Sequence, residues 1–416
     1  FAIGKNNAKY FDRQGWLYYT REYFDLFYPS YGDTYPTFNG SIGMTYEQAG
    51  HGVAGSAIIN HEGDTLTLYD RLIHHHTTGL STIEIASANA SRLVKEFRKY
   101  FNDAVSSGAG EYKSYVIKNQ PADEERVRSL LALLDKNGIR YGLTAAGSGK
   151  GFNYATGKEE SFSYGSQDIV ISALQPRSAM VKALMEPRSR LVDSATYDIS
   201  AWSLPYAYGL AAWASKDRIA GSGSWKKPAV ENADTDYGYV MEWTGVSSAR
   251  VAGQLLQKGI LLRFAEQPFT IDGKSFERGS VIILKTANKS FGNNLWKTAR
   301  EAADSSGVKL HPVSGGFVDK GYDFGSDKVR PFKAPKAVLL TGEGINANAA
   351  GEIWHFFEQQ LHYPLTLVNA GDITRVDWNE FNTLIMPDGN YRFLNDKTSV
   401  EAFKEWVQKC VRVIAL

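Results

Sequence analysis

The sequence predicts a multidomain α/β protein, and three observations lead to this expectation. The chain has 416 residues, of which 43% are hydrophobic, enough for about three domains with cores of their own. Its central part contains two similar successions of strand-like and helix-like segments. Its last part begins with a strand, a Gly-rich turn, a helix and a strand, which is the order of an open doubly wound sheet.

Charge and composition exclude several classes of function. Lys and Arg number 46 against 45 Asp and Glu, so a net charge of +1 provides no field to recruit nucleic acid or an anionic membrane. The apolar stretch of residues 203–216 is broken by Pro205 and is too short to span a bilayer. The single cysteine, Cys410, excludes an intrachain disulfide and a Cys-rich metal site. We therefore expect no nucleic-acid partner and no membrane span.

The first part of the chain, residues 1–104, predicts strands followed by a helix. Residues 44–47, MTYE, alternate as a short strand does. Residues 57–76 show aliphatic alternation around His61-Glu62-Gly63-Asp64, which predicts a hairpin. Residues 81–104 place apolar side chains at helical spacing after a Ser-Thr start with Glu84 three positions on, the pattern of a capping box.

One isolated carboxylate, Glu47, stands among Tyr, Gly and small residues in the segment FYPSYGDTYPTFNGSIGMTYEQAG, residues 27–50. With the hairpin and helix that follow, this segment resembles the carboxypeptidase A-like zinc metallopeptidases. The resemblance implies that Glu47 is the general base and acid at the end of a core strand. It also implies that Tyr28, with Tyr31 as second choice, is the mobile phenol that closes over a peptide substrate. The alternative interpretation, without a catalytic role, is that Glu47 ends an exposed strand and that the aromatic residues belong to the hydrophobic core.

The resemblance also implies a zinc ion, held in that family by a His-x-x-Glu pair and a later His that precede this segment. The first histidine here is His51. We therefore expect the chain to be the carboxyl-terminal portion of a larger metallocarboxypeptidase, to bind no zinc itself and to be inactive alone. The family resemblance is the only ground for expecting an extracytoplasmic, periplasmic or secreted, location.

Three consecutive histidines, His74, His75 and His76, also suggest a metal site because imidazole is the commonest zinc ligand. Consecutive residues of a strand point to alternate faces, however, and three of them do not converge on one tetrahedral ion. We interpret this run as the polar end of a strand.

The middle of the chain, residues 111–330, contains an internal repeat whose copies span residues 111–186 and 237–313. Both copies follow the order β-α-β-β-α, and Phe162-x-x-Gly165-Ser166 in the first matches Phe276-x-x-Gly279-Ser280 in the second. We expect the copies to pack as one α/β domain. Residues 147–151, GSGKG, lack the Lys-Ser or Lys-Thr of a phosphate-binding loop and predict a hairpin loop.

Aromatic residues gather between the two copies. They are Tyr197, Trp202, Tyr206, Tyr208 and Trp213. Such density is typical of packing, and we interpret these residues as a contact surface toward the peptidase part. The alternative is a ligand groove.

The tail, residues 336–416, predicts the start of a doubly wound, flavodoxin-like sheet. It resembles the class I glutamine amidotransferase-like domains, whose catalytic Cys lies on a sharp turn just after a strand that matches residues 411–416. Cys410 precedes that strand. His355, Glu358 and His362 have the spacing of zinc ligands but lie some three hundred residues after the Glu47 region, and we interpret them as helical surface residues.

Two further functions stay open on the sequence. The middle and tail domains could form a non-catalytic module that binds peptide or glycan, for which a groove lined by Tyr206, Tyr208 and Trp213 would be the sign. An amidotransferase-like enzyme would instead require a reactive Cys or Ser. Because residues 1–104 provide only part of a sheet, we also expect self-association through this part.

Overall fold

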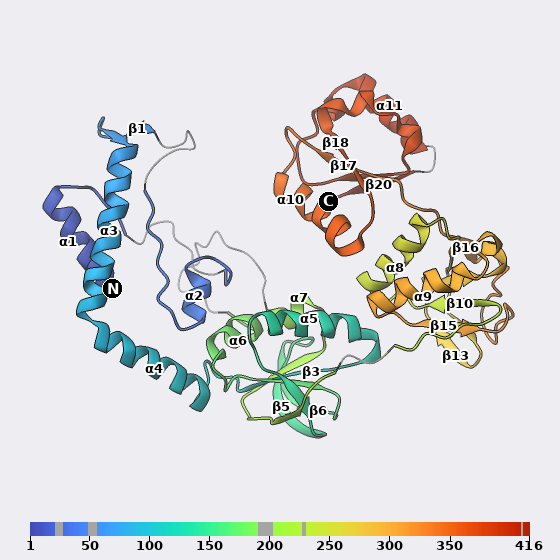
Figure 1. Ribbon diagram of the computed structural model, residues 1–416, viewed down its shortest axis with the longest axis horizontal. Coiled ribbons are helices and arrows are strands. Elements are labelled where there is room, and N and C mark those ends of the chain that lie inside the picture. Colours follow the sequence, from blue (N-terminus) through green and yellow to red (C-terminus); the bar gives the residue numbers. More distant parts are fainter. Residues whose placement is uncertain (21–27, 49–55, 190–202, 227–229, 409–410) are drawn as a thin grey trace. The chain divides into compact units, whose positions relative to one another are not determined.

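The computed structural model describes residues 1–20, 28–48, 56–189, 203–226, 230–408 and 411–416 (Figure 1). It confirms the α/β class, with five sheets and helices between their strands. The chain divides into two compact units, Phe1–Lys226 and Lys227–Leu416, which we describe separately. None of the described helices is long and apolar enough to cross a membrane.

The described part of residues 1–106 is mainly helical. The helices are α1 (Ala2–Gln14), α2 (Thr34–Phe38), α3 (Leu68–Ala88) and α4 (Ala90–Ser106). The strands β1 (Ala57–Ile59) and β2 (Thr65–Thr67) form the predicted hairpin with its turn at residues 60–64. This hairpin is shorter than expected, because the second half of the predicted range belongs to α3.

Helix α3 begins at a capping box that the sequence analysis did not choose. The hydroxyl of Thr67 accepts a hydrogen bond from the backbone N–H of Asp70, whose carboxylate accepts from the backbone N–H of Thr67. Both donors of the first turn are thereby satisfied fourteen residues before the expected start at Ser81. Ser81 instead lies buried inside α3, where Asn6 of α1 donates to its hydroxyl. Residues 81–104 are helical as expected, but the predicted start at Ser81 is wrong, and they belong to two helices that are separated at Asn89.

The first copy, with the described part of the segment that follows it up to residue 223, forms five strands of one core sheet with two main α-helices and an inserted hairpin. In chain order the elements are β3 (Ser114–Ile117), α5 (Glu124–Lys136), β4 (Gly142–Thr144), the hairpin β5 (Gly147–Asn153) and β6 (Lys158–Tyr164), β7 (Ile169–Ser172), α6 (Ser178–Met185), β8 (Ala212–Ser215) and β9 (Gly221–Gly223). A short helix, α7 (Leu204–Ala207), precedes β8. The sheet order is β6-β5-β8-β3-β7-β4-β9, with antiparallel pairing throughout.

The second copy repeats this succession. Its elements are β10 (Gly238–Met241), α8 (Val246–Gln257), β11 (Arg263–Ala265), the hairpin β12 (Phe269–Ile271) and β13 (Lys274–Phe276), β14 (Val281–Leu284), α9 (Asn294–Ser306), β15 (Leu310–Val313) and β16 (Val329–Pro331). The sheet order β15-β10-β14-β11-β16 equals the order β8-β3-β7-β4-β9 of the first copy. The first four strands of each order form a split β-α-β arrangement, to which a fifth strand is added at one edge.

The structure differs from the expected single middle domain. Each copy has its own sheet and its own buried cluster, and the division between units falls after Lys226, between the copies. Each sheet covers its helical face with two helices of its own, so neither copy requires the other to bury its strands. Residues 147–151 are also not a loop, since they begin strand β5.

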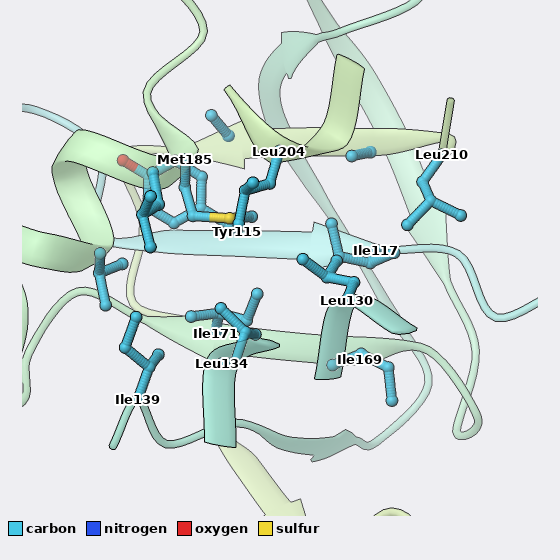
Figure 2. Close-up of a cluster of buried hydrophobic side chains, with 14 of the residues drawn as sticks. Tyr115, Ile117, Leu130, Leu134, Ile139, Ile169, Ile171, Met185, Leu204 and Leu210 are labelled. Carbon is cyan, nitrogen blue, oxygen red and sulfur yellow. The ribbon is translucent and has the colours of Figure 1, made fainter. Parts of the chain in front are cut away.

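The strands of each copy alternate between two buried faces. Tyr115 and Ile117 of β3 lie in the cluster on the helical face, among Leu130 and Leu134 of α5 (Figure 2). Val116, between them, lies in a separate cluster with Phe162 of the inserted hairpin. In the second copy, too, alternate residues of the central strand lie in one cluster with the helices and in another with the inserted hairpin. The inserted hairpin therefore covers the sheet face that the helices leave open.

The tail is a four-stranded parallel sheet in the order β18-β17-β19-β20. Its elements are β17 (Ala337–Thr341), α10 (Ala347–His355), a π-helical turn (Phe356–Leu361), β18 (Leu365–Asn369), β19 (Thr383–Met386), α11 (Lys397–Gln408) and β20 (Arg412–Ala415). The loops that follow the two central strands meet, because the backbone N–H of Asn390 donates to Gly344 O at 2.7 Å. Gly344 has φ 87°, and a Cβ there would stand 2.6 Å from Asn390 O, so this approach requires glycine.

Candidate functional site

Glu47 lies in an irregular segment, residues 42–48, that precedes helix α3 in the sequence and lies against it. Both neighbours of Glu47 contact this helix. Tyr46 Oη lies 2.9 Å from Thr82 Oγ1, and Gln48 Oε1 lies 3.0 Å from His74 Nδ1. Glu47 itself is exposed between these two anchored residues. The local geometry therefore presents a single carboxylate to solvent on a segment fixed at both sides.

The expected strand at residues 44–47 is wrong, since the structure places no strand there. A strand requires a partner for its backbone N–H and C=O groups. Within the described residues this segment lies against a helix, and side chains rather than a backbone ladder hold it.

His74 is a buried histidine with aromatic neighbours. Its ring centroid lies 4.4 Å from that of Trp16 and 5.3 Å from that of Phe11. Burial lowers the pKa of His74, an effect that the carboxylate of Asp70 opposes and the neighbouring His75 reinforces. An amide oxygen only accepts hydrogen bonds, so Nδ1 carries the proton that it donates to Gln48 Oε1.

Tyr28 and Tyr31 lie together before helix α2. Their ring centroids are 5.2 Å apart in an edge-to-face arrangement, and Tyr28 is more than one-third exposed. The backbone oxygen of Tyr28 accepts a hydrogen bond from Thr34 Oγ1 at 2.6 Å. The structure brings the two tyrosines to each other. The segment of Glu47 contacts α3 through Tyr46 and Gln48, and its Thr45 donates a hydrogen bond to the side chain of Asp33, the residue before α2.

The described part of the chain shows no cluster of metal-ligating side chains. It contains no group of three or more His, Cys, Asp or Glu side chains arranged to hold a metal ion. His74, His75 and His76 lie on helix α3 rather than at the end of a strand, which corrects the expected location of this run. His74 is engaged with Gln48, while His75 and His76 are exposed, so the three side chains do not share one environment.

The second copy of the repeat contains a cluster of titratable residues that the sequence analysis missed. Lys274 Nζ of the hairpin lies 3.0 Å from Glu242 Oε2, and His311 Nε2 of β15 lies 3.1 Å from the same oxygen. Lys274 Nζ and His311 Nε2 are 2.8 Å apart. Burial first, and then the charge of Lys274, lower the pKa of His311, while Glu242 opposes this effect. Extending the alignment of the two repeats to the last strand would have revealed the position of His311.

The three described aromatic residues between the copies do not line one groove. Tyr208 packs against the core on the helical face, and Tyr206 contacts Tyr154 of the same core with ring centroids 5.0 Å apart. Trp213 lies on the opposite face, where its ring stacks on that of Phe162 at 5.2 Å. The sheet separates them, so Tyr206, Tyr208 and Trp213 do not form the groove that would be the sign of a binding module. Tyr197, Trp202 and Cys410 lie outside the described residues.

Comparisons with models of protein families, with curated proteins and with solved structures found no match for this chain.

Proposed function

We propose that this chain is part of a zinc-dependent metallocarboxypeptidase that hydrolyses carboxyl-terminal residues from peptides. The observation that carries the proposal is the exposed carboxylate of Glu47 on a segment anchored through Tyr46 and Gln48 to helix α3. General acid-base catalysis requires such a group, held in place yet open to substrate and water. Glu47 takes the proton of the attacking water and passes it to the leaving amine.

The proposal extends to the architecture and the location. Residues 1–104 are the carboxyl-terminal part of the catalytic domain, and residues 336–416 are the start of a flavodoxin-like, glutamine amidotransferase-like domain. The parallel order β18-β17-β19-β20 supports the second assignment. An extracytoplasmic location is proposed from the family resemblance.

The described residues contain no group of three or more side chains that could hold zinc. The proposal therefore requires that residues other than the described ones bind the metal. The metal would supply a water of lowered pKa. We derive no step through the metal. The part assigned to this chain is proton transfer by Glu47 and contact with substrate by Tyr28, or by Tyr31 as second choice.

The test is steady-state kinetics on the complete product of the gene that encodes these residues, with peptides as substrates and zinc content measured in parallel. Glu47→Gln keeps the shape of the side chain and removes its basicity, so kcat should fall by roughly 10²–10⁴-fold with zinc content unchanged. Glu62→Gln is the matched control, because Glu62 is an exposed carboxylate in the hairpin turn. Near-normal turnover by Glu47→Gln, or a zinc-loaded protein that releases no terminal residue, would overturn the proposal.

Tyr28→Phe should have a smaller effect than Glu47→Gln. A phenol that orients substrate or stabilises charge contributes no more than one oxyanion donor, so we expect kcat/KM to fall by about 10²-fold or less. The same substitution at Tyr31 distinguishes the two candidates. If both variants match the wild-type protein, neither tyrosine contacts the substrate.

A further inference from the structure

The segment that contains Glu47 is held by two side chains of α3 and by Asp33, which accepts a hydrogen bond from Thr45. Thr82 holds Tyr46, and His74 holds Gln48. Thr82 Oγ1 also donates to Thr78 O at 2.7 Å, so one of its hydrogen-bonding positions is used within the helix. His74 has no comparable bond to the helix backbone among the contacts of the described residues.

The environment of His74 restricts its ring. Trp16 and Phe11 pack against it at 4.4 and 5.3 Å between centroids, and the residue is only 8% exposed. A buried imidazole between two aromatic side chains loses little further freedom when it donates a hydrogen bond. Its Nδ1 is therefore a fixed donor, while the exposed His75 beside it has no such restriction.

We propose that His74 is a positioning residue for Glu47, acting through the amide of Gln48. This role rests on the proposed function of Glu47. A catalytic carboxylate must keep its position to within a fraction of an ångström, and a segment without a backbone ladder obtains this precision from its side-chain anchors. Helix α1 takes part indirectly, because it provides Phe11 and its chain continues into Trp16.

The contact itself is testable without any enzyme assay. Amide hydrogen exchange of residues 42–48 is measured in the 416-residue chain for the wild-type protein, His74→Phe, His74→Asn and the control His75→Phe. Phe fills the ring volume without a donor, and the Asn side-chain NH₂ stands close to the position of Nδ1. Exchange should accelerate about 5-fold or more in His74→Phe and remain near the wild-type rate in His74→Asn and His75→Phe. Equal rates in all four proteins would overturn the proposal.

The catalytic consequence is measured on the complete gene product. His74→Phe should lower kcat by about 10-fold to 10²-fold with KM and zinc content unchanged, and His74→Asn should restore most of this loss. Gln48→Met removes the acceptor instead of the donor and should reproduce the loss, even if His74→Phe folds poorly. A normal kcat in Gln48→Met, or a loss in His74→Asn as large as in His74→Phe, contradicts the positioning role.

These two measurements separate the two proposals. A wild-type protein without peptidase activity overturns the proposed function, and with it the role of His74 in catalysis. Faster exchange in His74→Phe would in that case still establish His74 as the anchor of residues 42–48.

Discussion

His311 occupies in the second copy the position that Trp213 holds in the first. The strand registers show this, because Trp213 pairs with Val116 in one sheet and His311 pairs with Val240 in the other. Both side chains contact the phenylalanine of the inserted hairpin, Trp213 by stacking and His311 edge-to-face. One copy thus has a permanently neutral ring at this position, and the other has a ring that can be charged.

We expect His311 to make the stability of the protein depend on pH. Its pKa in the folded chain lies below the ordinary 6.5, so the unfolded chain binds a proton more readily. The stabilising contribution of neutral His311 is fully present above pH 6.5 and is lost as the pH falls toward the lowered folded pKa. Urea unfolding at several pH values should show a steeper loss of stability in the wild-type protein than in His311→Phe.

The comparison between the two proteins is necessary because burial also lowers the pKa of His74. That contribution is common to both proteins and cancels in the difference. If His311→Phe shows the same dependence on pH as the wild-type protein, the interpretation of His311 as a partly buried neutral ring is wrong.

At the scale of single elements, helix α3 carries the local structure of the candidate site. It provides two anchors of the Glu47 segment, and it packs against α1 through Ser81 and Glu84, which accept hydrogen bonds from Asn6 and Tyr10. A change at the start of α3 is therefore expected to affect the Glu47 segment and the contact with α1 as well as the first turn of the helix.

Thr67→Ala should weaken this start. Removal of the capping hydroxyl leaves the N–H of Asp70 without its partner, at a cost of about 1 kcal/mol in the stability of the helix. Hydrogen exchange in residues 68–72 should accelerate accordingly. Thr65→Ala, an exposed threonine of β2, is the control and should have a much smaller effect. Unchanged exchange in Thr67→Ala would contradict the assigned helix start.

The elements show why part of the fold could be predicted and part could not. The buried strands around Tyr115 and Tyr239 and the helices after them follow from local apolar spacing, and the structure confirms them. The order of strands in each sheet and the fifth strand depend on pairing between distant segments, which spacing does not reveal. The helical start at Thr67 was hidden because residues 65–72 also alternate in a way compatible with a strand.

The same distinction holds for the candidate site. Glu47 could be singled out from the sequence as an isolated carboxylate among small and aromatic residues. Its anchors, Thr82 and His74, could not, because they are 35 and 27 positions away and contact the segment only through side chains. The sequence pattern places the histidine run on a strand, whereas it lies on helix α3. The contact of the His74 ring with Gln48 could therefore not be predicted.

At the scale of the whole molecule, the helices of the first part leave apolar side chains uncovered. On α3 they form a stripe at intervals of three, eight and three residues, and on α4 a second stripe follows a similar spacing. The exposed members are Tyr69, Leu72, Leu80 and Ile83 on α3, and Val94, Phe97 and Val105 on α4. Rows of exposed apolar side chains along a helix are typical of surfaces that another polypeptide covers.

We therefore expect the 416-residue chain to associate with itself through these helices. Its solution mass, measured by light scattering over a range of concentrations, should exceed that of a monomer. Leu80→Glu combined with Ile83→Glu should shift it toward the monomer, whereas Lys95→Glu, which changes charge outside the stripes, should not. A monomeric wild-type chain at all concentrations would contradict this expectation.

The metal content of the 416-residue chain provides another measurement at this scale. After dialysis against a chelator we expect less than one zinc per chain and no carboxypeptidase activity, because the described residues contain no group of three ligands. One tightly held zinc per chain would contradict this expectation and would direct attention to His355, Glu358 and His362. Elemental analysis of the purified chain decides between these outcomes.

The residue that follows the first strand of each copy is positively charged in one copy and negatively charged in the other. This difference affects how readily strands could exchange between the two copies. Lys118 follows β3 and pairs with Asp168 at 2.6 Å, whereas Glu242, at the matching position after β10, pairs with Lys274 at 3.0 Å. Two sheets of the same strand order in one polypeptide risk exchanging strands during folding. If β3 entered the sheet of the second copy, Lys118 would meet Lys274, and if β10 entered the first, Glu242 would meet Asp168. Each wrong exchange would bring like charges together, so the opposite sign of the charge at this position disfavours strand exchange between the copies.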